Sequence, residues 1–114
     1  MTLNDFLAEI KLNSSISFAE TMEVISENYD YTQTAFRNGL VENQAGQNEG
    51  SCKIFAFAKL NELTESQTLL LFGDYYHGDV LQNPDGTDHQ NIRQFMQNGW
   101  AGIEFESDAL KVKC

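Results

Sequence analysis

Hydrophobic residues at helical spacing predict two amphipathic helices in the first quarter of the chain. In the first, the apolar positions follow the i, i+3, i+4, i+7 pattern: Leu3, Phe6, Leu7 and Ile10. This pattern predicts a short helix over residues 3–12. Ser17 and Glu20 have the spacing of a capping box, in which each side chain bonds the backbone amide of the other residue. The second helix is therefore expected near residues 18–28.

Two further helices are predicted in the middle of the chain. Residues 52–60 are apolar on nearly every side, so we expect this helix, with Ser51 as its cap, at the centre of the core. Residues 64–67 read Thr-Glu-Ser-Gln, which is another capping box. The helix that follows it is expected to reach about His77 or Leu81.

The segment that leads to Trp100, the single tryptophan, combines a turn with a helix. Residues 84–86 read Pro-Asp-Gly, in which proline presets φ and glycine tolerates positive φ, so the chain is expected to reverse there. Thr87 is then expected to cap the amide of Gln90 at the start of a helix. The apolar face of that helix consists of Ile92, Phe95 and Met96. Gly99 is expected to end it.

One hairpin is predicted before the central helix. Residues 38–39 read Asn-Gly, a strong short hairpin signal, and the residues before them are β-branched and aromatic. We therefore predict a strand over residues 31–37 that turns into 40–43, with Phe36 opposite Val41.

A second hairpin is predicted after Trp100, where apolar and charged residues alternate on both sides of a Ser107-Asp108 loop. The expected pairs are Phe105 with Leu110, Ile103 with Val112 and Glu104 with Lys111. Together these patterns predict an α+β fold. We expect one domain over residues 1–114, with about five helices packed on a small antiparallel sheet of two hairpins.

Composition and charge narrow the possible partners. Hydrophobic residues make up 41% of the 114 residues and include eight phenylalanines, enough for a core. Seventeen acidic and seven basic residues give a net charge of −10, which repels nucleic-acid phosphates and anionic lipid headgroups. We therefore expect neither a nucleic-acid nor a membrane partner. The sequence shows no long apolar run and no signal-peptide pattern, so a cytoplasmic location is expected.

The two cysteines, Cys52 and Cys114, belong to no CxxC pair, and we expect both to be free thiols. Cys52 falls near the start of a predicted helix, where the helix dipole favours a reactive thiolate. It is therefore a candidate nucleophile for a Cys-His-Asp arrangement. The alternative is a small buried apolar residue, and the phenylalanines that follow Cys52 favour that interpretation.

Five residues within thirteen positions are candidates for a cation site or an acid–base site: His77, Asp79, Asp85, Asp88 and His89. Their spacing matches no compact ligand motif, so we expect neither a metal nor a cofactor. The alternative makes Asp85 a turn former, Asp88 a helix-dipole partner and His89 a solvated residue of the first helical turn. Arg93, one helical turn after His89, is a candidate ion-pair partner for Asp88 or Glu20.

Four segments carry a resemblance to a known family, and they occur in order at residues 48–58, 72–76, 84–93 and 98–100. Together they resemble the HopJ family of type III effector proteins, over about residues 17–106. The resemblance implies a small bacterial protein, named for an effector delivered into host cells, without an established enzymatic activity or cofactor. Injected effectors usually begin with a disordered leader, whereas residues 2–12 are predicted to be helical.

Two functional hypotheses follow. The first is a HopJ-like interaction protein that binds a protein partner, in its own cell or in a host cell, through an acidic surface. The second is a small hydrolase or transferase whose site joins Cys52 or a metal to the turn at residues 85–89. The candidate residues of this second hypothesis are Cys52, His77, Asp85, Asp88 and His89.

Overall fold

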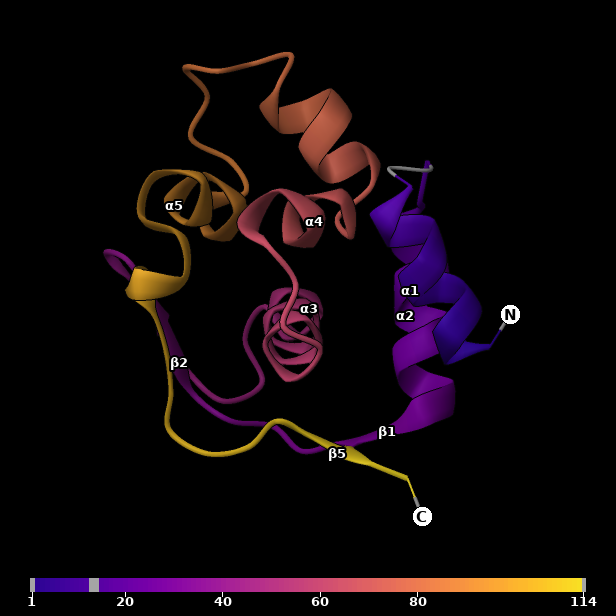
Figure 1. Ribbon diagram of the computed structural model, residues 1–114. Helices are drawn as coiled ribbons and strands as arrows, with labels where there is room; N and C mark the ends of the chain where they lie inside the picture. The colour runs from indigo at the N-terminus through magenta and orange to yellow at the C-terminus, as the bar shows by residue number, and fades with distance from the viewer. Residues whose placement is uncertain (1, 13–14, 114) are drawn as a thin grey trace.

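The computed structural model describes residues 2–12 and 15–113 and confirms the α+β class. The helical elements are α1 (Leu3–Lys11), α2 (Phe18–Asn28), α3 (Glu49–Leu60), α4 (Glu65–Leu70), the π-helix η1 (Tyr75–Val80), α5 (Gln90–Asn98) and the 3₁₀-helix η2 (Gly99–Gly102). The strands are β1 (Tyr29–Tyr31), β2 (Phe36–Asn38), β3 (Val41–Asn43), β4 (Ile103–Phe105) and β5 (Leu110–Val112). In Figure 1, α3 lies at the centre and the other elements surround it.

Helix α3 is central because its sequence offers apolar side chains in every direction. Six of its residues are buried: Cys52, Ile54, Phe55, Ala56, Phe57 and Ala58. The ring of Phe55 lies 4.9 Å from the ring of Phe95 and 5.6 Å from that of Phe72, measured between centroids. On the side of α1, the ring of Phe57 lies 5.9 Å from that of Phe6. Burial of one such ring contributes roughly 1.5–3 kcal/mol, so α3 organises the core.

The predicted C-terminal hairpin at residues 102–113 is wrong. The strands form two antiparallel sheets, β1-β5 and β3-β2-β4, so β4 and β5 pair with early strands and not with each other. Glu104 lies opposite Arg37, and Lys111 lies opposite Asp30. Glu104 and Lys111 thus each face an opposite charge, as expected, but that charge lies on β2 or β1 and not on the partner strand of the predicted hairpin. The alternation of apolar and charged residues identifies the buried face of a strand, but it does not determine which other strand pairs with it.

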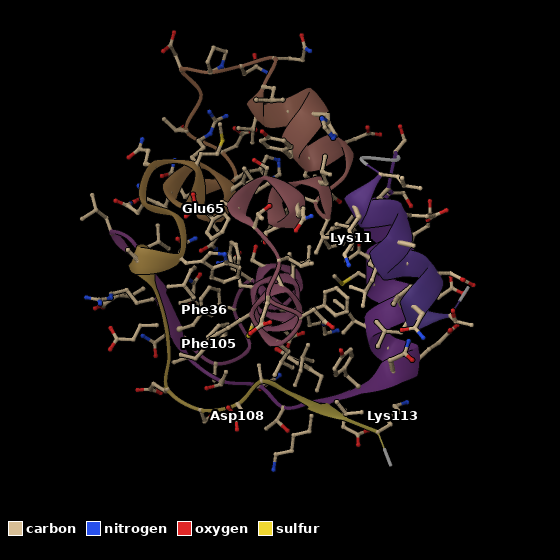
Figure 2. The ribbon with its side chains drawn as sticks, viewed as in Figure 1. Lys11, Phe36, Glu65, Phe105, Asp108 and Lys113 are labelled. Carbon is tan, nitrogen blue, oxygen red and sulfur yellow. The ribbon has the colours of Figure 1, made fainter. Side chains whose placement is uncertain are left out.

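The two separate sheets wrap α3 on adjacent sides. Phe36 on β2 and Phe105 on β4 stack with centroids 5.4 Å apart, and Figure 2 shows them together between the strands and α3. Leu110 on β5 is buried at the other sheet. The chain therefore needs both sheets because a single short hairpin cannot cover two sides of the helix.

The predicted early hairpin forms with a different register and a shorter first strand. Residues 31–37 are not one strand, because β1 ends at Tyr31 and β2 begins at Phe36. Phe36 lies opposite Asn43, and Asn38 lies opposite Val41, so the prediction of a Phe36–Val41 pair is wrong. The side chain of Asn38 is fully buried and donates to the carbonyl of Asn91 at 2.6 Å. This long-range bond favours a turn at residues 39–40.

The helix boundaries follow the capping signals where those signals are local. The helix near 18–28 and the Thr64 capping box are confirmed. Helix α3 begins earlier than predicted, with Asn48 and not Ser51 as its N-cap. The predicted continuous helix from residue 65 to His77 or Leu81 is interrupted, since α4 ends at Leu70 and Gly73 adopts φ +60°. A Cβ atom on Gly73 would lie 2.7 Å from the backbone nitrogen of Phe18.

Helix α5 also begins later than predicted. Its N-cap is His89, with φ 50°, and not Thr87. The side chain of Gln90 reaches back and donates to the carbonyl of Thr87 at 2.7 Å. Gly99 ends the helix with φ 59°, as predicted, and Trp100 anchors the exit by donating from Nε1 to the carbonyl of Leu63 at 3.1 Å.

Arg93 holds the connection between η1 and α5 in place. Its guanidinium donates to the carbonyls of Asn83 at 2.9 Å and of Asp88 at 2.6 Å, and to Asp88 Oδ1 at 2.6 Å. The predicted pairing with Asp88 is confirmed. A Cβ atom on Gly86 would lie 2.7 Å from the guanidinium, which explains the glycine there. The hydrogen bond from Arg93 holds the pKa of the Asp88 carboxyl below its usual range.

Substitution Arg93→Ala is expected to lower the free energy of unfolding by about 2 kcal/mol, because hydrogen bonds from a charged donor to the loop carbonyls are lost. Urea unfolding measures the change, and amide exchange of residues 83–88 should rise with it. Arg37→Ala is the control, since Arg37 pairs with Glu104 in solvent and its loss should cost less than about 1 kcal/mol. Equal effects of the two substitutions would contradict the role of Arg93.

Acid should weaken the same connection in wild type. Because the pKa of Asp88 is lowered in the folded state, its contribution to stability is complete above the usual aspartate range and disappears as pH falls through the lowered pKa. The protection of amides at residues 83–88, corrected for the intrinsic exchange rate at each pH, should therefore fall at a higher pH than the protection of amides in α3. In Arg93→Ala this local acid dependence should be absent.

Candidate functional site

His89 is the predicted site residue around which the structure gathers other polar groups. Its Nε2 atom lies 3.0 Å from Asp79 Oδ2 and 3.8 Å from Asp88 Oδ2. Asp79 belongs to η1 and His89 to the start of α5, so this contact ties the two elements together. The contact with Asp79 fixes the orientation of the imidazole ring. The structure thus brings together three of the five candidates for a cation or acid–base site, Asp79, Asp88 and His89.

A cleft of about 450 Å³ opens beside His89. Three rings form one of its walls, with Tyr75 lying between Phe18 at 5.1 Å and His89 at 5.3 Å. The cleft lies where α2, β3, α3, η1 and α5 meet. Its lining consists of Phe18, Val41, Asn48, Gly50, Ser51, Phe72, Tyr75, His89, Gln90, Asn91 and Ile92. All of these residues except Phe18 and Val41 come from the segments at 48–58, 72–76 and 84–93.

Two helices begin at this cleft with the same unusual geometry. The N-caps of α3 and α5, Asn48 and His89, both have φ 50°, and neither side chain caps its helix. The first-turn amides therefore lack a side-chain acceptor from the N-cap, and such amides attract negatively charged or carbonyl oxygens. Gly50 is needed here, because a Cβ atom would lie 2.7 Å from the Phe18 ring.

Cys52 lies away from the histidines. Its side chain is buried, with 1% exposed, and burial is the main cause that raises the pKa of its thiol to about 11. Its polar neighbours include the carbonyl of Thr34, at 4.0 Å from the sulfur, and the side chain of Tyr31. A buried thiol with a raised pKa is a poor nucleophile, so the geometry favours the interpretation of Cys52 as a core residue.

The remaining candidates, His77 and Asp85, lie outside the cleft. His77 is exposed on η1 beside the ring of Tyr76, at 5.1 Å between centroids. Asp85 lines a separate groove of about 290 Å³, which also contains Leu81 and Met96. We call it the Leu81–Met96 groove. Within residues 2–12 and 15–113, no three His, Cys, Asp or Glu side chains are grouped so that they could hold a metal ion.

The connection that carries these groups is strongly acidic. Four aspartates between residues 74 and 88 are all exposed, and we call them the acidic crown: Asp74, Asp79, Asp85 and Asp88. The crown occupies the top of Figure 1, on η1 and the loop before α5. A larger hollow, of about 510 Å³, lies on the three-stranded sheet and is lined by Glu42, Glu104 and Glu106 among others. It contains no histidine, cysteine or hydroxyl side chain.

Two features of this site were missed from the sequence. Ser51, interpreted only as a helix cap, lines the His89 cleft. Asp79, which belonged to the predicted acidic and histidine cluster without a role of its own, is the residue that contacts His89. The ten-residue spacing between Asp79 and His89 contains no periodic signal, because the intervening turn sets their distance.

Comparison with known proteins identifies the family. The family model described as HopJ type III effector protein matches residues 3–110, a longer span than the resemblance over 17–106. The structure is similar to the crystal structure of the unknown function protein VPA0580, with a TM-score of 0.94 and 52% sequence identity, over 99% of this chain and 95% of that chain. No curated protein matches the chain. No helix among the described residues is long and apolar enough to cross a membrane. The chain belongs to the HopJ type III effector protein family.

Proposed function

We propose that this protein is an interaction domain that binds a positively charged protein partner through its acidic crown. The observation that carries the proposal is the exposure of all four crown aspartates on the segment from Asp74 to Asp88, whose η1 and following loop project at the top of Figure 1. Residues 60–92 contain no lysine or arginine. Among the described side chains, His89 and Arg93 contact the crown only at Asp79 and Asp88, so the charges of Asp74 and Asp85 are not paired.

The charge around the crown remains negative over a longer part of the chain. Between residues 60 and 110 there are nine acidic side chains and a single basic one, Arg93. Arg93 is largely buried and bonded to the loop, so its charge is already paired. A field of one sign attracts a basic partner and accelerates its association, and it repels phosphates and anionic lipids.

The crown is also held in a defined shape. Arg93 bonds the loop from inside, and the contact between His89 and Asp79 joins the loop end to η1. A surface that is ordered before binding loses less conformational entropy when the partner arrives. The family name supports a partner in a host cell, and the same surface would serve a partner in the cell that makes the protein.

Neutralising two crown aspartates should abolish capture of the partner. Asp74→Asn with Asp85→Asn removes two exposed charges whose side chains make no hydrogen bond within the described chain, so the fold should persist. Proteins retained from bacterial and host lysates are identified by affinity purification and mass spectrometry. The amount of each specifically retained protein should fall at least about tenfold in this variant. The matched control is Glu23→Gln with Glu27→Gln on α2, which also removes two exposed charges. Identical losses in both variants would reject the crown as the binding surface.

A second candidate function rests on the cleft. His89 is oriented by Asp79, and Ser51 lines the same cleft at the start of α3, where free amides suit a developing oxyanion. We propose as the alternative a small acyl hydrolase in which Ser51 attacks the carbonyl carbon and His89 accepts its proton. His89 then protonates the leaving alcohol, and water hydrolyses the acyl-serine. In this alternative the nucleophile is Ser51 and not Cys52, the residue that follows it.

Covalent labelling distinguishes the two functions. Under the alternative, a fluorophosphonate probe labels Ser51, and His89→Ala lowers the labelling rate at least about a hundredfold. Ser66→Ala, on α4, is the control and should change nothing. If the protein is an interaction domain alone, intact-mass spectrometry shows no adduct in any variant. Labelling of a serine other than Ser51 would reject the catalytic alternative.

A further inference from the structure

The Leu81–Met96 groove runs along one face of α5. The α5 residues that line it recur at helical spacing: Gln90, Arg93, Gln94, Met96 and Gln97. Val80 and Leu81, at the end of η1, form the facing wall. Val80 is buried, whereas Leu81 and Met96 are each 44% exposed. The groove therefore has an apolar floor and two apolar side chains that still face water.

The exposed charge in the lining of this groove is negative. Asp85 lines it directly, and the other crown aspartates lie on the same connection. Arg93, the basic residue in its lining, is buried and bonded to Asp88 and the loop carbonyls. The groove therefore combines an apolar centre with an acidic edge. An occupant that complements it needs an apolar side chain flanked by lysine or arginine.

The shape of the groove favours a helical occupant. Its walls come from two helical elements, and the space between the side-chain ridges of two helices accepts a third helix. The glutamines at 90, 94 and 97 supply donors and acceptors along one wall. Leu81 and Met96 can adjust to a side chain placed between them, since the methionine side chain is flexible. Recognition of this kind uses apolar anchors at i, i+3, i+4 and i+7.

We infer that the Leu81–Met96 groove binds an amphipathic, positively charged helix of the partner protein. This inference rests on the proposed function and names the chemistry of the partner. One apolar side chain of the helix enters between Leu81 and Met96. Lysine or arginine side chains on the adjacent turns reach Asp85 and the other crown carboxylates.

A designed helical peptide tests this inference. The probe is a fluorescent sixteen-residue peptide with leucine at i, i+3, i+4 and i+7 and with lysine and alanine elsewhere. The reference peptide has the same composition in an order that breaks the leucine stripe. Fluorescence anisotropy should show at least about tenfold tighter binding of the striped peptide to the wild-type chain. Amide chemical shifts should change at residues 80–97.

Two pairs of substitutions separate apolar from electrostatic recognition. Leu81→Ser with Met96→Gln should remove the preference for the striped peptide, whereas Leu12→Ser with Val112→Ser, which alters exposed apolar residues elsewhere, should leave it intact. Asp74→Asn with Asp85→Asn should weaken both peptides about equally. Circular dichroism confirms that every variant is folded before its binding is compared.

The outcomes distinguish this inference from the proposed function. Equal binding of the two peptides, sensitive only to the aspartate substitutions, would overturn the groove and leave the acidic crown as a charge-only surface. Failure of both peptides to bind, while the crown still captures a partner from lysate, would also overturn the groove. Shift changes confined to the hollow at Glu42, Glu104 and Glu106 would overturn the groove and the crown together.

Discussion

The structure depends on the burial of one helix on most of its sides. Helix α3 exposes polar side chains only at its ends and at Lys53, so a single packed layer would leave most of its apolar surface in water. The chain solves this by surrounding α3 with α2, α4, α5 and two sheets, each of which covers one side. The short strands and the interrupted helix after Leu70 follow from this arrangement, because each element needs to be only long enough to cover part of α3.

The sequence predicts those parts of the fold that are encoded by neighbouring residues. Capping at Ser17 and Thr64 places two helix starts correctly, because the donor and acceptor lie three residues apart. Strand partners are set by distant residues, and alternation of Glu104 and Lys111 carries no information about Arg37 and Asp30. The same limit applies to Asn38, whose burial against Asn91 decides the hairpin register but leaves no local signal.

The candidate site shows the same division. Asp88 and His89 could be selected from the sequence because they lie in a turn with residues that suit helix starts. The contact of His89 with Asp79, the left-handed backbone at Asn48, and the position of Ser51 beside the cleft all require the tertiary structure. For Cys52 the sequence offered two interpretations, a reactive thiol near a helix start and a small buried residue, and it favoured the second, which the burial of the side chain supports. The hydrophobic residues that follow Cys52 in the sequence already indicate that its side chain is buried.

The strand pairings also determine when the protein can become complete during its synthesis. Strand β5 pairs with β1, so residues 110–112 must meet residues 29–31 across about 80 positions of chain. Such distant contacts form late, after the entropy of closing a long loop has been overcome. Until then one side of α3 stays uncovered, and a nascent chain that lacks β5 exposes an apolar surface. Closure of the core therefore depends on β5, and before β5 pairs with β1 the uncovered side of α3 is open to contact with other chains or with chaperones.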